Sequence, residues 1–301
     1  FGESSCLAPL KEMTSAEIAD IESGERRKRL ACLFLLPASL APSWTLRPHI
    51  LASYRPQSGY RACLRSLFTV HNEFANTWTH LVGFFIFVGL TVYFIVKGNS
   101  STDLLFGLIL LIPSMLCMIS STLYHLFACH SEPVFQKLYR CDLMGISSMV
   151  AGGWYPGVHY GFYCAPEWRY RYLWFSSFIV VGAIAMPHLG LPQRYTSLFY
   201  GFAGCTGWVP LIHWVQLSGG LASEEVAAFF WTLVWVFLYY AIGGLFYLTA
   251  FPEARWPGRF DCWGNSHNLW HIFVLMGGLQ MYYSMLKNQA WRMEHPCPAA
   301  S

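Results

Sequence analysis

The stretch VAAFFWTLVWVFLYYAIGGLFYLTA, from Val226 to Ala250, contains no charged residue. An α-helix rises about 1.5 Å per residue, so about twenty apolar residues are enough to cross a hydrocarbon core roughly 30 Å thick. We therefore predict a transmembrane helix over this stretch. Such a helix anchors the chain in a bilayer, where backbone polar groups must pair within helices or a closed barrel.

Six other segments have a similar length and apolar character. They are separated by short connections that contain Pro, Gly and charged residues. The sequence thus predicts an all-α membrane protein, a bundle of seven transmembrane helices. The six further predicted spans are Thr77–Val96, Leu104–Phe127, Leu138–Tyr160, Tyr172–Leu189, Ser197–Leu217 and His267–Met285.

The composition of the whole chain agrees with a membrane location. Of its 301 residues, 55% are hydrophobic and 12% are charged, against about 25% charged in soluble domains. The net charge of +3 is small and scattered, which excludes nucleic-acid binding. No two of the ten cysteines form a CxxC pair, so we predict buried apolar cysteines and no disulfide framework.

Residues 1–66 are predicted to form an N-terminal tail, 67–287 the seven-helix domain, and 288–301 a short C-terminal tail. Within the N-terminal tail, RRKRLACLFLLPASLA (Arg26–Ala41) resembles a signal peptide, but it starts well inside the chain and contains Pro37. Its apolar part is too short to span a bilayer, which favours an amphipathic segment on the membrane surface.

The orientation follows from Lys and Arg near the spans, because cytosolic loops carry more of them. The short loops hold equal numbers on the two sides, and the N-terminal tail breaks the tie with Arg61, Arg65 and the basic run at 26–29. We predict a cytosolic N-terminus. Because seven is odd, the C-terminus then lies in the lumen or outside the cell.

Four ionisable residues stand at the rims of predicted spans, where charge is costly in a bilayer. His125 closes the second span, Asp142 opens the third, and His267 and His271 open the seventh. The second span ends on the side of the membrane where the third begins. The seventh span begins on that same side, because an even number of crossings separates the start of the third from the start of the seventh. All four therefore lie at one membrane face, which is cytosolic in the predicted orientation.

These residue types and their spacing predict a zinc site. His267 and His271 are four apart and share a helix face, and His125 supplies a third imidazole, which leaves a fourth zinc position open to water. Asn268 stands where the HExxH motif of zinc proteases has its Glu, so Asp142, the one carboxylate predicted at that depth, is the candidate base. Ser121, one turn before His125, is placed to hydrogen-bond the water or a substrate carbonyl.

Each of these residues also has a structural interpretation. The histidines could face lipid headgroups, Asp142 could complement the positive end of its helix, and Ser121 could bond back to the Cys117 carbonyl. The convergence of four such groups at one depth favours the metal site. Asn72, Asn76 and His80 form a polar helix face that we predict to be structural and to contact the cytosolic end of the bundle rather than the metal.

The motifs together resemble the progestin and adipoQ receptor family, relatives of adiponectin receptors and haemolysin-III proteins. The resemblance implies a seven-helix fold unrelated to G-protein-coupled receptors, a cytosolic N-terminus, and zinc held by His125, His267 and His271 with Asp142 and Ser121 beside the bound water. The motifs run from about Leu51 to Leu286 and are YR, SLFTVHNEFANTWTH, STLYH, CDLMG, PGRFD and SHNLWH.

Two further motifs, HWVQLSGG and FYCAPEWR, resemble the Golgi-resident member that tethers a Raf kinase, whereas CLRSLFTVHNE and GRFDCWGNSH resemble its nearest sister. Ser53 replaces the Gly usual before Tyr-Arg, and the acidic stretch common in the tail is missing.

Two function classes follow from these observations. The first is a lipid- or hormone-responsive receptor or a zinc-dependent amidase acting on ceramide or another N-acyl membrane lipid. The alternative is a non-catalytic anchor in the Golgi membrane, whose cytosolic tail sequesters a Raf-type kinase and damps MAP-kinase signalling. A Golgi location is favoured over the plasma membrane. A channel is disfavoured, because no span carries paired charges at the bilayer midplane.

Overall fold

The computed structural model describes residues 35–191 and 193–297, which form an irregular segment followed by a series of helices. A six-residue helix, α3 (Tyr60–Arg65), precedes the long helices. The long helices are α4 (Phe74–Val96), α5 (Ser101–Phe127), α6 (Glu132–Gly161), α7 (Pro166–Ala185), α8 (Gln193–Thr206), α9 (Trp208–Leu217), α10 (Glu224–Thr249) and α11 (Ser266–Glu294).

Helices occupy all seven segments that the sequence predicts to cross the membrane. Among the described residues, α4, α5 and α10 are long and apolar enough to span by length and composition. The fold class is therefore confirmed as an all-α membrane protein. The surface stretch predicted around Arg26–Ala41 lies mostly outside the described residues, and its last part forms a single 3-10 turn, Ala38–Leu40.

The fifth predicted span is not one continuous helix, because it is broken into α8 and α9 at Gly207. Pro210 lies four residues after Thr206, the last residue of α8. Proline has no N–H to bond the Thr206 carbonyl, and its ring crowds that carbonyl. The apolar pattern continues across the break, which is why hydropathy alone predicts one span.

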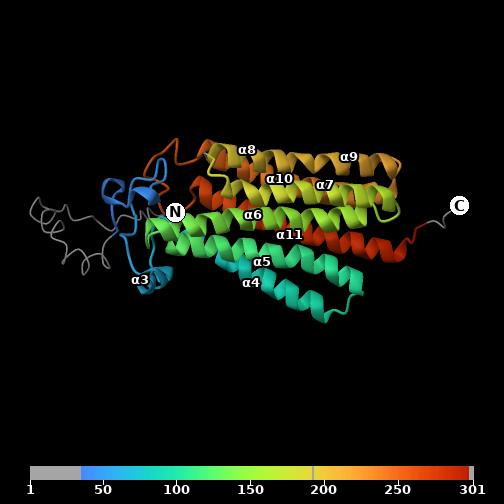
Figure 1. The fold of residues 1–301 in the computed structure, drawn as a ribbon, viewed down its shortest axis with the longest axis horizontal. Coiled ribbons are helices and arrows are strands. Elements are labelled where there is room, and N and C mark those ends of the chain that lie inside the picture. Colours follow the sequence, from blue (N-terminus) through green and yellow to red (C-terminus); the bar gives the residue numbers. More distant parts are fainter. Residues whose placement is uncertain (1–34, 192, 298–301) are drawn as a thin grey trace, which may run out of the picture. The chain divides into compact units, whose positions relative to one another are not determined.

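The helices divide into two compact units. The first unit holds the described residues 35–79, 122–139 and 243–272, and the second holds 80–121, 140–191, 193–242 and 273–297. Several long helices, among them α5 and α11, contribute one end to each unit (Figure 1).

In the first unit, an irregular N-terminal segment is fastened to chain far away in sequence. The Asp261 carboxylate accepts the backbone N–H of Leu51 at 3.1 Å and of Ala52 at 2.7 Å. Leu36 and Tyr54 exchange two backbone hydrogen bonds. The buried Arg55 side chain donates to the Leu126 carbonyl at the end of α5, at 2.7 Å. This segment thus covers the helix ends of its unit.

In the second unit, α6, α10 and α11 are joined by polar contacts. Arg292 of α11 donates to the Tyr160 carbonyl of α6 at 3.1 Å and forms an ion pair with Glu225 of α10. Cys164 and Cys297 form a disulfide, which the cysteine spacing did not predict. A cluster of buried residues fills the interior beside these contacts: Val158, Phe162, Leu211, Trp214, Val226 and Phe229.

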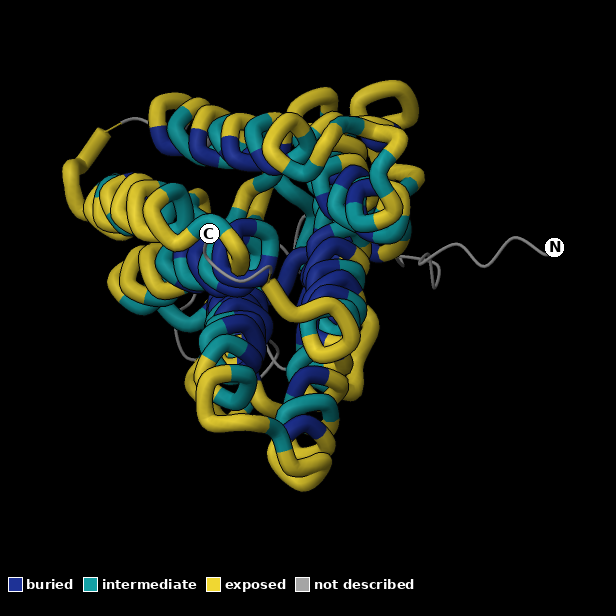
Figure 2. The backbone as a smooth tube through the Cα atoms, turned by 90° about the vertical axis from the view of Figure 1, so that its right-hand side faces the viewer, coloured by how far each residue is buried: buried dark blue, intermediate teal, exposed yellow. Residues whose placement is uncertain are grey.

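Each long helix buries one side and exposes the other, as the alternation of dark blue and yellow along the helices in Figure 2 shows. On α4, Phe87 and Phe94 are fully buried, whereas Val96 is 79% exposed and Phe85 62% exposed. Large apolar side chains are exposed on several other helices too. Apolar surface of this extent suits lipid as the surrounding medium.

Candidate metal centre

The start of α11 is set by local capping, and it places two histidines in the first two turns. The Asn265 side chain accepts the N–H of Asn268 at 3.0 Å, which satisfies a helix N-terminal donor. The buried Glu253 carboxylate accepts the N–H of Ser266 at 2.7 Å, and a negative charge there complements the helix dipole. His267 and His271 follow on one side of this helix.

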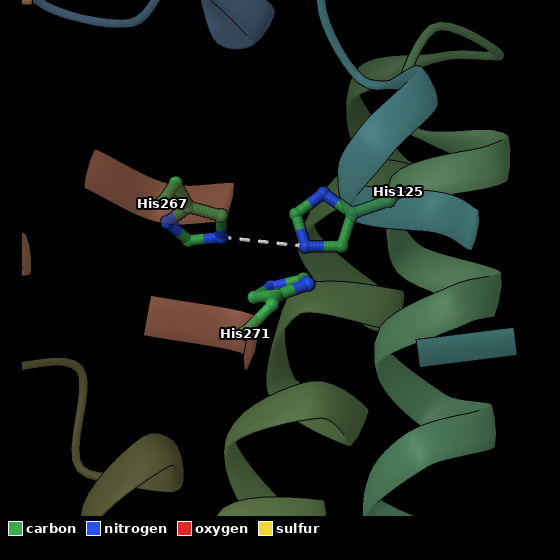
Figure 3. A group of neighbouring side chains, drawn as sticks. All are labelled: His125, His267 and His271. Atoms are coloured by element: carbon green, nitrogen blue, oxygen red, sulfur yellow. Dashed lines mark hydrogen bonds between the residues drawn. The ribbon is translucent and has the colours of Figure 1, made fainter. Parts of the chain in front are cut away.

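Three imidazoles converge from two helices (Figure 3). His125 belongs to the last turn of α5, and the other two belong to α11. The Nε2 atoms of His125 and His267 are 3.4 Å apart, and candidate ligand nitrogens of all three rings lie within 4.8 Å of one another. His125 and His271 are buried, and His267 is half-buried.

This donor set fits a zinc ion. Zinc binds imidazole nitrogens at about 2.0–2.1 Å in tetrahedral geometry, so two ligand nitrogens lie about 3.3 Å apart. The 3.4 Å separation of His125 Nε2 and His267 Nε2 matches that value. Among the described residues, the group holds these three histidines and no fourth His, Cys, Asp or Glu.

Glu73, just before α4, orients the first of these histidines. Its Oε2 lies 2.7 Å from Nδ1 of His125, so the Nδ1 proton is held there and Nε2 is left with its lone pair. Glu73 also accepts from Asn76 Nδ2 at 2.7 Å and from Arg47 Nε. Burial opposes ionisation of this carboxyl, yet the Arg47 guanidinium and His125 hold its pKa well below the usual range.

His271 is oriented in the same way by the beginning of α4. Its Nδ1 lies 3.2 Å from the Asn76 carbonyl and 3.2 Å from Thr79 Oγ1, which turns Nε2 toward the other two rings. The Asn268 amide donates to the side-chain oxygen of Asn76. Asn76 thus contacts His271 directly, and the prediction that this polar face does not contact the metal itself stays a prediction.

Sequence reasoning missed Glu73, Arg47 and Arg55. Glu73 is a carboxylate in direct contact with His125, so the prediction that Asp142 is the one carboxylate at that depth is wrong. The signal was present in NEFAN, where an acidic residue stands directly before an apolar helix. Glu73 is only 5% exposed, and a buried carboxylate normally has a charged or hydrogen-bonded partner.

Ser121 and Asp142 belong to the second unit, and their predicted places beside a bound water stay predictions. The Ser121 hydroxyl is buried and has no hydrogen-bond partner in the described part of the chain. Its neighbour Ser120 is the residue that donates to the Cys117 carbonyl, at 3.1 Å. The structural interpretation of Ser121 as a back-bonding serine is therefore wrong.

Fold and site together define a multi-pass helical membrane protein with a buried three-histidine centre. A family model described as "Haemolysin-III related" matches residues 68–282. The chain is 32% identical over 274 residues to human progestin and adipoQ receptor family member 3, with 87% of each chain covered. The chain belongs to this haemolysin-III-related family, which includes the progestin and adipoQ receptors.

Relatives occur in plants and insects as well. Heptahelical transmembrane protein 1 of Arabidopsis thaliana is 34% identical over 266 residues, which cover 83% of this chain and 79% of that protein. The adiponectin receptor protein of Drosophila melanogaster is 31% identical over 248 residues, which cover 79% of this chain and 55% of that protein. The matched region includes the three histidines, since the family model spans all of them.

Proposed function

We propose that the chain binds one zinc ion through His125, His267 and His271 and acts on amide-linked membrane lipids such as ceramide. One observation carries this proposal: three imidazoles converge, with ligand nitrogens within 4.8 Å of one another and one pair 3.4 Å apart, without a fourth protein ligand in the described residues. Structural zinc sites are usually closed by four protein ligands, whereas catalytic sites keep one position for water or substrate. The donor set therefore favours chemistry over a purely structural metal.

The proposed roles of the side chains follow from their chemistry. A zinc ion bound at such a site supplies a Lewis acid toward water and toward an amide carbonyl. Glu73 holds His125 in the ligating tautomer, and Asn76 does the same for His271. Asp142 accepts a proton from the attacking water, and the Ser121 hydroxyl, which has no other described partner, donates to the substrate carbonyl.

The same centre serves a receptor as well as a hydrolase. Relatives of this chain are named as progestin and adipoQ receptors and as an adiponectin receptor. If the protein is a receptor, a lipid or hormone signal acts through the zinc centre. Hydrolysis of an N-acyl lipid is then the reaction that an assay measures.

The test combines metal analysis with a hydrolysis assay in lipid nanodiscs, using a panel of N-acyl lipids. We expect about one zinc per chain and amide hydrolysis that falls roughly 10²–10⁴-fold in Asp142→Asn, because Asn is nearly isosteric but a poor proton acceptor. The control Glu167→Gln changes an exposed ion pair on α7 and should leave the rate unchanged. A metal-free protein, or an Asp142→Asn variant with the wild-type rate, would refute the catalytic proposal.

A second candidate is the non-catalytic Golgi anchor that recruits a Raf-type kinase through the cytosolic tail. Its support is the resemblance to the Golgi-resident member in HWVQLSGG and FYCAPEWR. In this case zinc binds, no N-acyl lipid is hydrolysed, and deletion of residues 1–34 abolishes kinase recruitment. Recruitment that survives the deletion would argue against the anchor.

A further inference from the structure

Two buried cysteines of the first unit face each other near the metal centre. Cys63 lies in α3, and Cys129 lies two residues after the end of α5. Their Sγ atoms are 3.6 Å apart, and the residues are 1% and 3% exposed. The sequence separates them by 66 positions, so no local pattern indicates the pair.

Backbone hydrogen bonds hold the chain around the two cysteines in place. The Ser58 N–H donates to the Cys129 carbonyl at 3.1 Å, which ties the start of α3 to the chain after α5. The Cys63 N–H in turn donates to the Gly59 carbonyl at 3.0 Å. Because both sulfurs sit on fastened backbone, their proximity is a property of the fold rather than of one side-chain rotamer.

The pair is connected to a ligand histidine through Arg55. The Ser66 hydroxyl donates to the Cys63 carbonyl at 2.7 Å and accepts from Arg55 Nη1 at 2.8 Å. The same guanidinium donates to the main-chain carbonyl of His125. A chain of three hydrogen bonds therefore links the backbone at Cys63 to the end of α5.

The local charge favours a reactive thiolate at Cys129. The Sγ–Sγ contact with Cys63, together with the positive charge of Arg55, lowers the pKa of Cys129 below that of an ordinary thiol. The thiolate is the form that reacts with oxidants, so Cys129 is the sulfur that attacks first.

We propose that Cys63 and Cys129 form a reversible, peroxide-driven disulfide that fastens α3 to the end of α5. The Cys129 thiolate attacks hydrogen peroxide, the O–O bond breaks, and the departing hydroxide takes up a proton as water, leaving a sulfenic acid. The Cys63 sulfur then attacks the Cys129 sulfur, and the hydroxyl departs with the Cys63 proton as a second water. Two thiols are oxidised and one peroxide is reduced to two waters.

The geometry requires only a small movement. A disulfide has its sulfurs about 2.05 Å apart, so closure shortens the present separation by about 1.5 Å. Hydrogen peroxide is small enough for this buried pair, whereas bulkier disulfides of low-molecular-weight thiols are excluded by the burial. In the predicted orientation the pair faces the cytosol, where disulfides are mostly transient and redox-sensing.

The test uses the full chain in nanodiscs, treated with hydrogen peroxide, quenched by alkylation, and digested for mass spectrometry. We expect the Cys63–Cys129 cross-linked peptide in most molecules and its loss after dithiothreitol. Hydrogen–deuterium exchange of residues 122–130 should slow at least about threefold in the oxidised protein, because closure restrains the end of α5. This readout does not depend on bound metal, so it fails or succeeds separately from the proposed function.

Matched variants separate the pair from general oxidation. Cys63→Ser should prevent the cross-link and leave Cys129 as a sulfenic or sulfinic acid, whereas Cys262→Ser, another buried cysteine of the same unit, should cross-link like the wild type. The proposal is overturned if Cys63 and Cys129 remain thiols in the wild-type protein, or if they are oxidised without forming the disulfide. Both outcomes are measured on the wild type, so they hold even if a variant fails to fold. Cross-linking without slower exchange at 122–130 would overturn the restraint of α5.

Discussion

Glu73 acts through a single ligand, and its replacement tests how the site is supported. Glu73→Gln keeps the size of the side chain but removes the charge that holds the His125 proton at Nδ1. Loss of such a supporting carboxylate typically weakens metal binding 10- to 100-fold. We expect a loss of this size in competition with a chelating dye, and no change in Glu167→Gln. Unchanged affinity in Glu73→Gln would mean that the contact does not support the ligand.

Replacement of His271 is the most direct test, at a single residue, of whether the three histidines bind zinc. Zinc that binds only the folded protein stabilises it by about 4 kcal/mol when its free concentration is a thousand times Kd. Chelation should therefore lower the melting temperature of the wild type and leave His271→Ala unchanged. His213→Ala is the control, because His213 contacts Tyr172 in the second unit and should retain the chelator response. Full zinc retention in His271→Ala would remove it from the ligand set.

At the scale of elements, the close approach of α5 and α6 in the second unit depends on glycine. A Cβ built on Gly145 would lie 2.9 Å from the Cys117 Cα and 2.4 Å from the Ser120 Oγ, and one on Gly152 would lie 2.8 Å from the Ile109 carbonyl oxygen. Because backbone cannot move aside as a flexible side chain can, either substitution by Ala has to separate the helices.

We expect Gly145→Ala to destabilise the protein by about 1–3 kcal/mol, the usual cost of overpacking. Gly201 of α8 has nothing within 4 Å of a built Cβ, so Gly201→Ala should be neutral or stabilise by up to about 1 kcal/mol, as expected for Ala in a helix. Thermal unfolding in nanodiscs measures both. Equal melting temperatures for the two variants would show that the two helices adjust freely.

At the scale of the whole molecule, two pairs of cysteines bear on the orientation. The joined pair, Cys164 and Cys297, lies beyond the C-terminal ends of α6 and α11, whereas the unjoined pair consists of Cys63 in α3 and Cys129 just after α5. Disulfides persist in oxidising compartments such as the secretory lumen, and thiols persist in the cytosol. The distribution agrees with the predicted cytosolic N-terminus, because seven crossings place the C-terminus on the lumenal side.

Labelling in sealed, cytosol-side-out vesicles tests that orientation. After a membrane-permeant reductant, an impermeant maleimide should reach Cys164 and Cys297 only once detergent opens the membrane. The control Glu132→Cys adds a thiol at the exposed first residue of α6 and should be labelled in sealed vesicles. Labelling of Cys164 before detergent would reverse the orientation.

The sequence by itself determined the helices and the three histidines. Both are local signals: a run of apolar residues about twenty long predicts a span, and His267 and His271 share a face because a helix turns every 3.6 residues. Counting the spans then brought His125 to the same membrane face without any knowledge of packing. Even the break at Gly207 had a local cause in Pro210.

Only the tertiary structure decided what supports those histidines. Glu73 meets His125 across 52 positions, Asp261 holds Leu51 across 210, and Cys164 joins Cys297 across 133. No periodicity links residues so far apart, because each contact depends on how packed helices and an irregular segment return the chain to the same place. Helix formation is governed by neighbouring residues, whereas the choice of a buried partner is governed by burial, since a buried charge or polar group must find its complement wherever the fold brings one.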